Sequence, residues 1–138
     1  MNEAVRSRVA ALLEAGLIGD AAARALDPIA VVDPAGGLHS WFVPVAAGES
    51  LVGFAELRPD LELLRYSSFP HPVRPADWID AETIREHAAT IAHPDETLGE
   101  PVLTYDRASS RLAWAVPATG PSGRSRTLYV TGGYAYEG

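Results

Sequence analysis

Histidine and aspartate side chains are the residues of this chain best suited to acid–base chemistry. A neutral imidazole and a carboxylate can pass a proton to or from a bound molecule near neutral pH. Placed around a pocket between the two halves of the chain, such groups would serve a small cofactor-free enzyme of the isomerase or cyclase type. The candidates for this role are Asp33, His39, His87 and Asp106.

A metal site is the second kind of chemistry that the residue types suggest. His93 stands just before Asp95 and Glu96, which offer oxygen ligands beside its ring nitrogen. However, His87 and His93 are six residues apart, whereas a pair of metal ligands on one helix needs a spacing of about four. The carbonyl groups at the end of a helix also favour a histidine there. We therefore expect no metal.

The composition excludes several other kinds of catalysis. The chain has no cysteine and no lysine, since all eleven basic residues are arginine. Thiol nucleophiles, zinc–cysteine sites and Schiff-base chemistry are therefore excluded. The sequence also lacks the Gly-x-Ser-x-Gly motif, the phosphate-binding P-loop and the dinucleotide-binding glycine pattern. We expect no cofactor.

Aromatic side chains are the main candidates for a binding surface. Tyrosine is enriched at binding sites because it offers a rigid apolar ring with a polar tip, and three tyrosines stand close together near the C-terminus. The tryptophans at positions 41 and 114 admit two interpretations: they fill a core between helix and sheet, or they line a groove between the halves. The candidate binding residues are Trp41, Trp114, Tyr129, Tyr134 and Tyr136.

The net charge of the chain indicates which classes of partner it can bind. Eighteen acidic residues against eleven arginines give a net charge of −7. Nucleic acids and anionic membranes attract basic proteins, so we expect neither as a partner. A protein or peptide partner, preferably a basic one, suits this charge better. Acidic residues interrupt the apolar N-terminal segment, and no apolar run reaches the roughly 20 residues of a membrane helix, so we expect a cytoplasmic protein.

The two halves of the chain resemble each other. Residues 28–46 align with residues 101–119 at a constant shift of 73, with six identities in nineteen positions. A repeat of this kind predicts two copies of one structural unit. The identical pairs include Pro28 and Pro101, Asp33 and Asp106, Trp41 and Trp114, Val43 and Val116, and Pro44 and Pro117.

A helix is predicted before each copy of the repeat. In the first half, apolar residues recur at helical spacing from Val5 to Leu13, and Gly16 is a natural end. In the second half, Asp80 is a good N-cap for a helix over residues 81–92. The side chains expected to cover the tryptophans are Val5, Val9 and Leu12 for Trp41, and Ile84, Ala88 and Ile91 for Trp114.

The remaining pattern is that of antiparallel strands. Apolar and polar residues alternate around Trp41 and Trp114, and glycine turns follow. We expect a helix–meander unit over residues 1–68, a proline-rich linker over residues 69–79 and a second helix–meander unit over residues 80–138. Because each unit alone is small for an independent core, we predict an α+β fold in which two repeated helix-plus-antiparallel-meander units share a core.

Both units resemble the PepSY and protease-propeptide family, in which a helix lies on a sheet in a cystatin-like arrangement. The matching segments are Trp41–Val45, Gly48, Leu51–Leu57 and Pro59–Leu64 in the first unit, and Leu112–Val116, Gly123, Leu128–Val130 and Thr131–Gly133 in the second. The resemblance implies non-catalytic domains that act as protease inhibitors, intramolecular chaperones or ligand-binding modules. It carries over no catalytic residue.

The interpretation that fits most of these features is a non-enzymatic binding module. Such a module would recognise a protein or peptide partner through a sheet surface or a strand edge, in the manner of an inhibitor, immunity protein or chaperone. The acid–base enzyme stays open as the alternative. An enclosed pocket that holds two of its four candidate residues would favour it.

Overall fold

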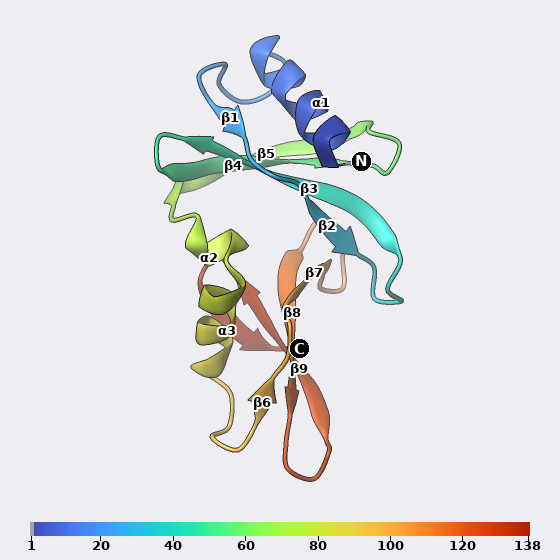
Figure 1. Cartoon of the computed structure of the whole chain (residues 1–138), viewed down its shortest axis with the longest axis vertical. Coiled ribbons are helices and arrows are strands. Elements are labelled where there is room, and N and C mark those ends of the chain that lie inside the picture. The colour runs from blue at the N-terminus through green and yellow to red at the C-terminus, as the bar shows by residue number, and fades with distance from the viewer. Residues whose placement is uncertain (1) are drawn as a thin grey trace. The chain divides into compact units, whose positions relative to one another are not determined.

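The computed structural model describes residues 2–138 and shows an α+β fold (Figure 1). Over these residues the chain forms three helices and two antiparallel sheets of five strands each, which confirms the predicted fold class. Contacts divide the chain into two compact units. The first contains the residues up to Val31 together with Gly36–Arg74, and the second contains Val32–Ala35 together with Pro75–Gly138.

The first unit is built from one helix and the first sheet. Its elements are α1 (Asn2–Glu14), β1 (Arg24–Ala25), β2 (Ile29–Val32, whose last residue is assigned to the second unit), β3 (Leu38–Ala47), β4 (Ser50–Leu57) and β5 (Leu63–Val73). The strands follow the order β1-β3-β4-β5, and β2 also pairs with β3. Helix α1 lies along one face of this sheet (Figure 1).

Helix α1 ends where its sequence predicts. Its apolar stripe, from Val5 onward, is buried in a cluster with residues of β3 and β4. The helix ends in a Schellman motif, in which the N–H of Gly16 donates to Leu13 O and the N–H of Leu17 donates to Leu12 O, both at 3.0 Å. This motif needs a left-handed residue, and the φ of Gly16 is +73°. The predicted helix end is confirmed.

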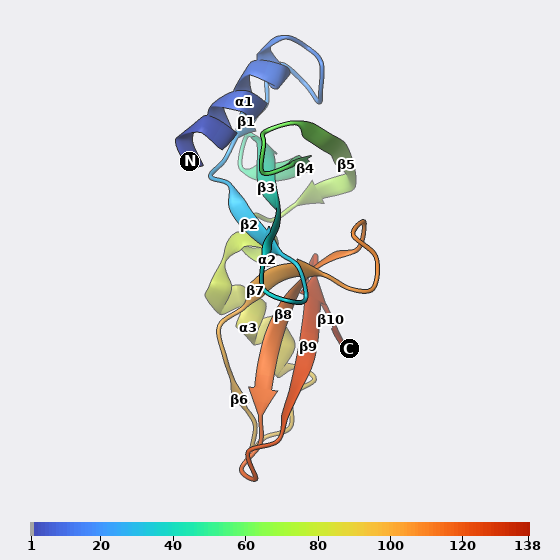
Figure 2. The ribbon, with the colours of Figure 1, turned by 90° about the vertical axis from the view of Figure 1, so that its right-hand side faces the viewer.

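The second unit is built from two helices and the second sheet. Its elements are α2 (Ala76–Ile79), α3 (Ala81–Ala89), β6 (Thr97–Leu98), β7 (Val102–Tyr105), β8 (Leu112–Thr119), β9 (Ser125–Thr131) and β10 (Tyr134–Glu137). The strands follow the order β10-β9-β8-β6, and β7 also pairs with β8. Figure 2 shows β8, β9 and β10 side by side.

Helix α3 starts at its predicted cap and ends early. The Asp80 side chain accepts a hydrogen bond from the N–H of Thr83 at 2.9 Å, which confirms the cap. Ile84 and Ala88 are buried as expected, but the helix stops at Ala89, so Ile91 lies beyond it and is half-buried. No helix within residues 2–138 is long and apolar enough to cross a membrane.

The segment 69–79, which the sequence predicts as a linker, contains regular structure. Residues 69–73 form the last part of β5, and Ala76–Ile79 forms α2. Strand β5 is at the edge of its sheet. Prolines 70 and 72 lack an N–H, and an edge strand tolerates this because one of its sides needs no sheet partner.

The two sheets have the same strand order, and a shift of 73 residues relates their pairings up to β4 and β9. Beyond these strands the sheets differ, because residues 58–62 join β4 to β5 whereas only Gly132–Gly133 joins β9 to β10. Duplication of one unit remains our interpretation of this pattern. Examples of equivalent pairs are Ala25–Val45 with Leu98–Ala118, and Trp41–Leu57 with Trp114–Val130.

The two repeated tryptophans lie in packed regions but differ in hydrogen bonding. Trp114 on β8 is buried, and its indole N–H donates to the backbone oxygen of Trp78 at 2.8 Å. Trp41 on β3 is half-buried against the apolar cluster that contains Val5 and Val9. Its buried Nε1 has no hydrogen-bond partner within residues 2–138. Each indole therefore contributes to the packing of its own unit rather than to an exposed surface.

Candidate binding surface

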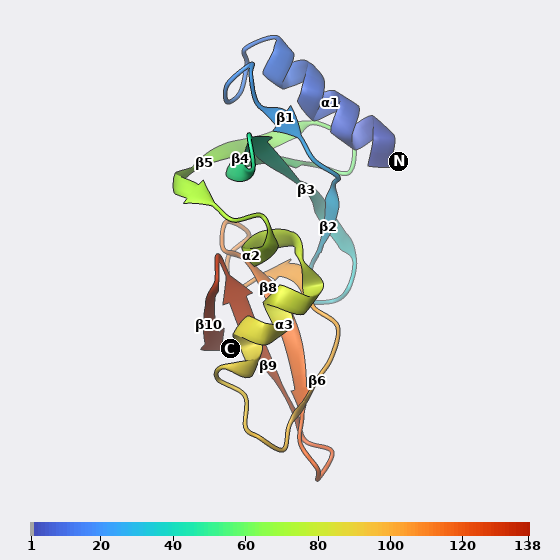
Figure 3. The same ribbon diagram turned by 60° about the vertical axis from the view of Figure 1, so that its left-hand side comes forward.

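Helix α3 lies on one face of the second sheet (Figure 3). On β8 and β9, Trp114, Val116, Leu128 and Val130 belong to the covered face and are buried. Successive residues of a strand point to opposite faces. The opposite face holds the buried Thr104 and Ala113 near one end of β7 and β8. Its remaining part, which we call the open face, carries half-buried or exposed side chains of β7 to β10: Val102, Ala115, Pro117, Thr127, Tyr129, Tyr134 and Tyr136.

Three tyrosines stack on the open face. The rings of Tyr129 and Tyr136 are 5.5 Å apart between centroids and inclined by 22°. The rings of Tyr134 and Tyr136 are 6.0 Å apart and inclined by 26°. We call Tyr129, Tyr134 and Tyr136 the tyrosine cluster. The three tyrosines expected at a binding surface are therefore brought together.

The turn between β9 and β10 sets this arrangement. Gly132 and Gly133 have φ values of +57° and +86°, and two successive residues with positive φ are typical of a type I′ hairpin turn. This turn places Tyr136 directly opposite Tyr129. Tyr134 stands two residues before Tyr136 and so points to the same face. The cluster thus depends on the two glycines as well as on the tyrosines.

Asp106, an acid–base candidate, supports the cluster instead. The hydroxyl of Tyr136 donates to Asp106 Oδ2 at 3.1 Å, and Arg111 Nη2 lies 3.7 Å from the same carboxylate oxygen. Burial of the Tyr136 hydroxyl raises its pKa, and the hydrogen bond to Asp106 raises the pKa further. Asp106 therefore fixes the position of one ring.

The other three acid–base candidates have partners of different kinds. Asp33 accepts a hydrogen bond from the N–H of Ala35 at 2.8 Å, as in a turn. His87 Nε2 lies 2.9 Å from Asp77 Oδ1 and so connects α3 to α2. His39 Nδ1 lies 2.9 Å from the hydroxyl of its neighbour, Ser40. His39 Nδ1 also lies 3.7 Å from Glu56 Oε2 on the neighbouring strand β4.

His39, Ser40 and Glu56 lie close together, but these three residues do not form a nucleophilic site. The hydroxyl of Ser40 donates to Glu56 Oε2, and Arg65 Nε donates to Glu56 Oε1 at 2.9 Å. Ser40 and Glu56 are both buried. A nucleophilic serine must be reachable and must give its proton to a base such as histidine. Ser40 is instead buried, with its proton directed to Glu56.

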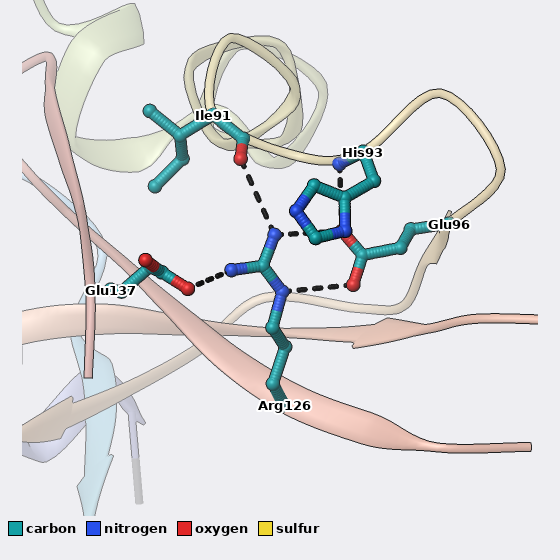
Figure 4. A network of polar contacts seen from close by, with 5 residues as sticks. All are labelled: Ile91, His93, Glu96, Arg126 and Glu137. Carbon is teal, nitrogen blue, oxygen red and sulfur yellow. Dashed lines mark hydrogen bonds and ion pairs between the residues drawn. The ribbon is translucent and has the colours of Figure 1, made fainter.

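A second polar network joins the loop before β6 to β9 and β10 (Figure 4). Arg126 donates to both carboxylate oxygens of Glu96 at 2.8 and 2.9 Å, to the backbone oxygen of Ile91 at 3.3 Å and to Glu137. The N–H of His93 donates to Glu96 Oε1 at 2.7 Å. The sequence pattern suggests a metal role or a helix-end role for His93 and a metal role for Glu96, and it does not point to Arg126.

The network changes the ionisation of its members. The hydrogen bonds from Arg126, and then the one from the His93 N–H, lower the pKa of Glu96 to about 2. The same hydrogen bonds to Glu96 raise the pKa of Arg126. Both oxygens of Glu96 are already engaged, so its carboxylate is a poor metal ligand. Within residues 2–138 no group of three or more histidine, aspartate or glutamate side chains is placed to hold a metal ion.

Two hollows lie on the surface, the second of them beside the network of Glu96 and Arg126. One, of about 450 Å³, is between α1 and residues 21–25, and the other, of about 540 Å³, is between residues 93–96 and the β8–β9 turn. Neither is lined by Asp33, His39, His87 or Asp106. The acid–base candidates therefore gain no support from these two hollows.

The low pKa of Glu96 predicts an acid-sensitive contribution to stability. A carboxylate whose pKa falls from 4.5 to about 2 on folding stabilises the fold above pH 4.5 and loses this contribution as pH falls toward 2. We expect Glu96→Gln to be less stable than the natural chain at neutral pH and to lose less stability over that acidic range. Urea unfolding at several pH values measures this difference.

Glu100→Gln is the matched control for this experiment, because Glu100 is an exposed acid paired with Arg85. The free energy of unfolding of Glu100→Gln should change with pH in the same way as that of the natural chain. If the free energy of unfolding of Glu96→Gln also changes with pH as that of the natural chain does, Glu96 is not the source of the acid-sensitive contribution to stability.

Comparison with known proteins yields no relative. No protein-family model, curated protein or solved structure matches this chain. The resemblance to PepSY and protease-propeptide domains therefore stays a prediction from sequence, and the basis for a functional proposal is the geometry of the open face.

Proposed function

We propose that this chain is a non-enzymatic binding module whose tyrosine cluster receives an extended segment of a partner protein. The observation that carries the proposal is the stack of three tyrosine rings on the open face. Tyr134, at one end of the stack, is 67% exposed. A partner that covers this ring removes a large apolar area from water, while the hydroxyl can still form a hydrogen bond.

The cluster is also held in place before a partner arrives. Tyr136 stacks between the other two rings, and its hydroxyl is bonded to Asp106. Binding to side chains that are already ordered costs less conformational entropy than binding to mobile ones. A rigid aromatic surface of this kind favours recognition of a partner.

The enzyme alternative has weaker support. Asp106 positions Tyr136, His87 connects two helices and Asp33 caps a turn. Such contacts leave these groups with structural roles. An inhibitor, an immunity protein or a chaperone would each use a binding surface without catalysis, and a cytoplasmic location stays an expectation from sequence.

Selection from a random peptide library displayed on phage tests the proposal. The immobilised natural chain should enrich peptides that bind it saturably. We expect Tyr134→Ala to weaken binding of these peptides at least about tenfold, because aromatic anchor residues often contribute about 2 kcal/mol or more to binding. Fluorescence titration of the selected peptides measures the change.

Leu17→Ala is the matched control, because Leu17 is 71% exposed but follows α1, outside the open face. This variant should bind the selected peptides as the natural chain does. If no peptide is enriched, or if the selected peptides bind Tyr134→Ala as tightly as the natural chain, the tyrosine cluster is not the binding surface.

A further inference from the structure

The outer edge of β10 lies beside the tyrosine cluster. Within residues 2–138, β10 pairs only with β9. The N–H of Gly138 donates to Thr127 O at 3.2 Å, and in an antiparallel pair every second residue bonds to the neighbouring strand. Tyr134 and Tyr136 therefore bond to β9, whereas the backbone N–H and C=O groups of Ala135 and Glu137 point away from it.

These outward groups form a short template for another strand. An extended peptide beside β10 can exchange backbone hydrogen bonds with Ala135 and Glu137. Its side chains then alternate between the two faces of the sheet. One set meets Tyr134 and Tyr136 on the open face, and the other set meets Ala135 and Glu137 on the opposite face.

The charge at this edge is negative on the side where Glu137 lies, whereas Asp106, which bonds Tyr136, has Arg107 and Arg111 beside it. Glu96 and Glu137 share the single guanidinium of Arg126, so the three groups together carry one negative charge. Glu96 is nearly buried, whereas the Glu137 side chain is 67% exposed. The whole chain carries a net charge of −7. A lysine or arginine opposite Glu137 would compensate the excess charge.

We propose that the partner segment is a basic, extended peptide that adds to β10 as a strand. Its backbone bonds to Ala135 and Glu137, its apolar or aromatic side chains cover the tyrosine cluster, and a basic side chain faces Glu137. This inference rests on the proposed function and adds the backbone pairing and the charge of the partner.

A second copy of this chain fits the edge less well. Pairing of two β10 strands would bring together two chains that each carry −7, and each would present an exposed Glu137. Like charges close together in paired strands are unfavourable. The negative edge thus favours a basic peptide over self-association.

Three synthetic peptides test the proposal directly. The first alternates lysine with valine and tyrosine, the second has glutamate in place of lysine, and the third is the first with alternate backbone amides N-methylated on the strand-pairing side. We expect the first peptide to bind the natural chain saturably. The second and third should bind at least about tenfold more weakly, because they lose the charge match and the backbone hydrogen bonds, respectively.

Substitution at Ala135 tests the same edge from the protein side. Ala135→Pro removes an outward N–H that β9 does not use, and proline is tolerated at such positions of edge strands. We expect this variant to bind the lysine peptide at least about tenfold more weakly, with Tyr134→Ala similarly impaired. Ala135→Thr keeps the N–H and should bind as the natural chain does. Circular dichroism and thermal melting check that both variants are folded.

The outcomes separate strand pairing from the proposed function. Equal binding of the N-methylated and unmodified lysine peptides, with loss only in Tyr134→Ala, would reject strand pairing and leave the tyrosine surface intact. Equal binding of the lysine and glutamate peptides would reject the basic partner. If none of the three peptides binds, the proposal is overturned. Analytical ultracentrifugation of the chain then shows its oligomeric state, and a dimer would indicate that a second copy occupies the edge of β10.

Discussion

Replacing Trp114 with alanine is expected to lower the free energy of unfolding by about 3–5 kcal/mol. The indole is buried on the face of β8 that α3 covers, and its N–H donates to the backbone oxygen of Trp78. The substitution removes a large apolar side chain from the core and leaves that carbonyl without its donor. Denaturant unfolding measures the loss, which is a large share of the stability of a domain of this size.

Phenylalanine substitutions at the two repeated tryptophans separate the contribution of the indole hydrogen bond from that of ring packing. Trp114→Phe keeps most of the ring volume but loses the hydrogen bond, so we expect a cost of about 1–3 kcal/mol. Trp41→Phe should cost less, because the Nε1 of Trp41 is buried without a partner within residues 2–138. Equal losses at both positions, or no loss in Trp114→Ala, would contradict the packing described for Trp114.

Replacing Arg65 with methionine is expected to lower the free energy of unfolding by about 3 kcal/mol. Arg65 Nε donates to Glu56 Oε1 at 2.9 Å, and Glu56 is only 2% exposed. Methionine can retain apolar contact with Phe54, over whose ring the Arg65 guanidinium lies at 5.2 Å. It leaves the buried carboxylate with Ser40 and the nearby His39 but without its arginine partner, and a buried charge that loses its ion pair is strongly unfavourable. Urea unfolding at neutral pH tests this expectation.

A double substitution separates the lost charge pairing from lost packing. Glu56→Gln removes the buried charge, so Arg65→Met should cost much less in that background. Arg58→Met is the surface control, because Arg58 and Asp60 form an exposed pair, and it should cost less than about 1 kcal/mol. If Arg65→Met costs no more than Arg58→Met, the pair with Glu56 is not a main contributor to stability.

Local signals in the sequence predict much of the fold. The cap at Asp80 and the helix end at Gly16 depend on residues only a few positions away. The shift of 73 residues, visible as identities around the tryptophans, relates the strand pairings of both sheets. The sequence predicts a helix over residues 81–92, but α3 ends at Ala89, because the residues at a helix end fray and the apolar pattern alone does not define the boundary.

The site is harder to predict because its contacts join distant residues. Alternation places Tyr134 and Tyr136 on one face, but the contact with Tyr129 requires the hairpin register set by Gly132 and Gly133. The pairing of Glu96 with Arg126 spans 30 residues. With eighteen acids and eleven arginines in the chain, many other pairings were equally compatible with the sequence.

The measurement that tests the tyrosine surface most directly is a nuclear magnetic resonance titration of the isotope-labelled chain. The lysine peptide and a phage-selected peptide are added in turn, and amide shifts are followed residue by residue. The amides of β10 and the neighbouring part of β9 should respond most, with the side-chain resonances of Tyr134 and Tyr136. The same titration of Tyr134→Ala should give much smaller changes. Shifts confined to α1, β4 or β5, or equal shifts in Tyr134→Ala, would contradict the proposal that the tyrosine cluster binds the partner.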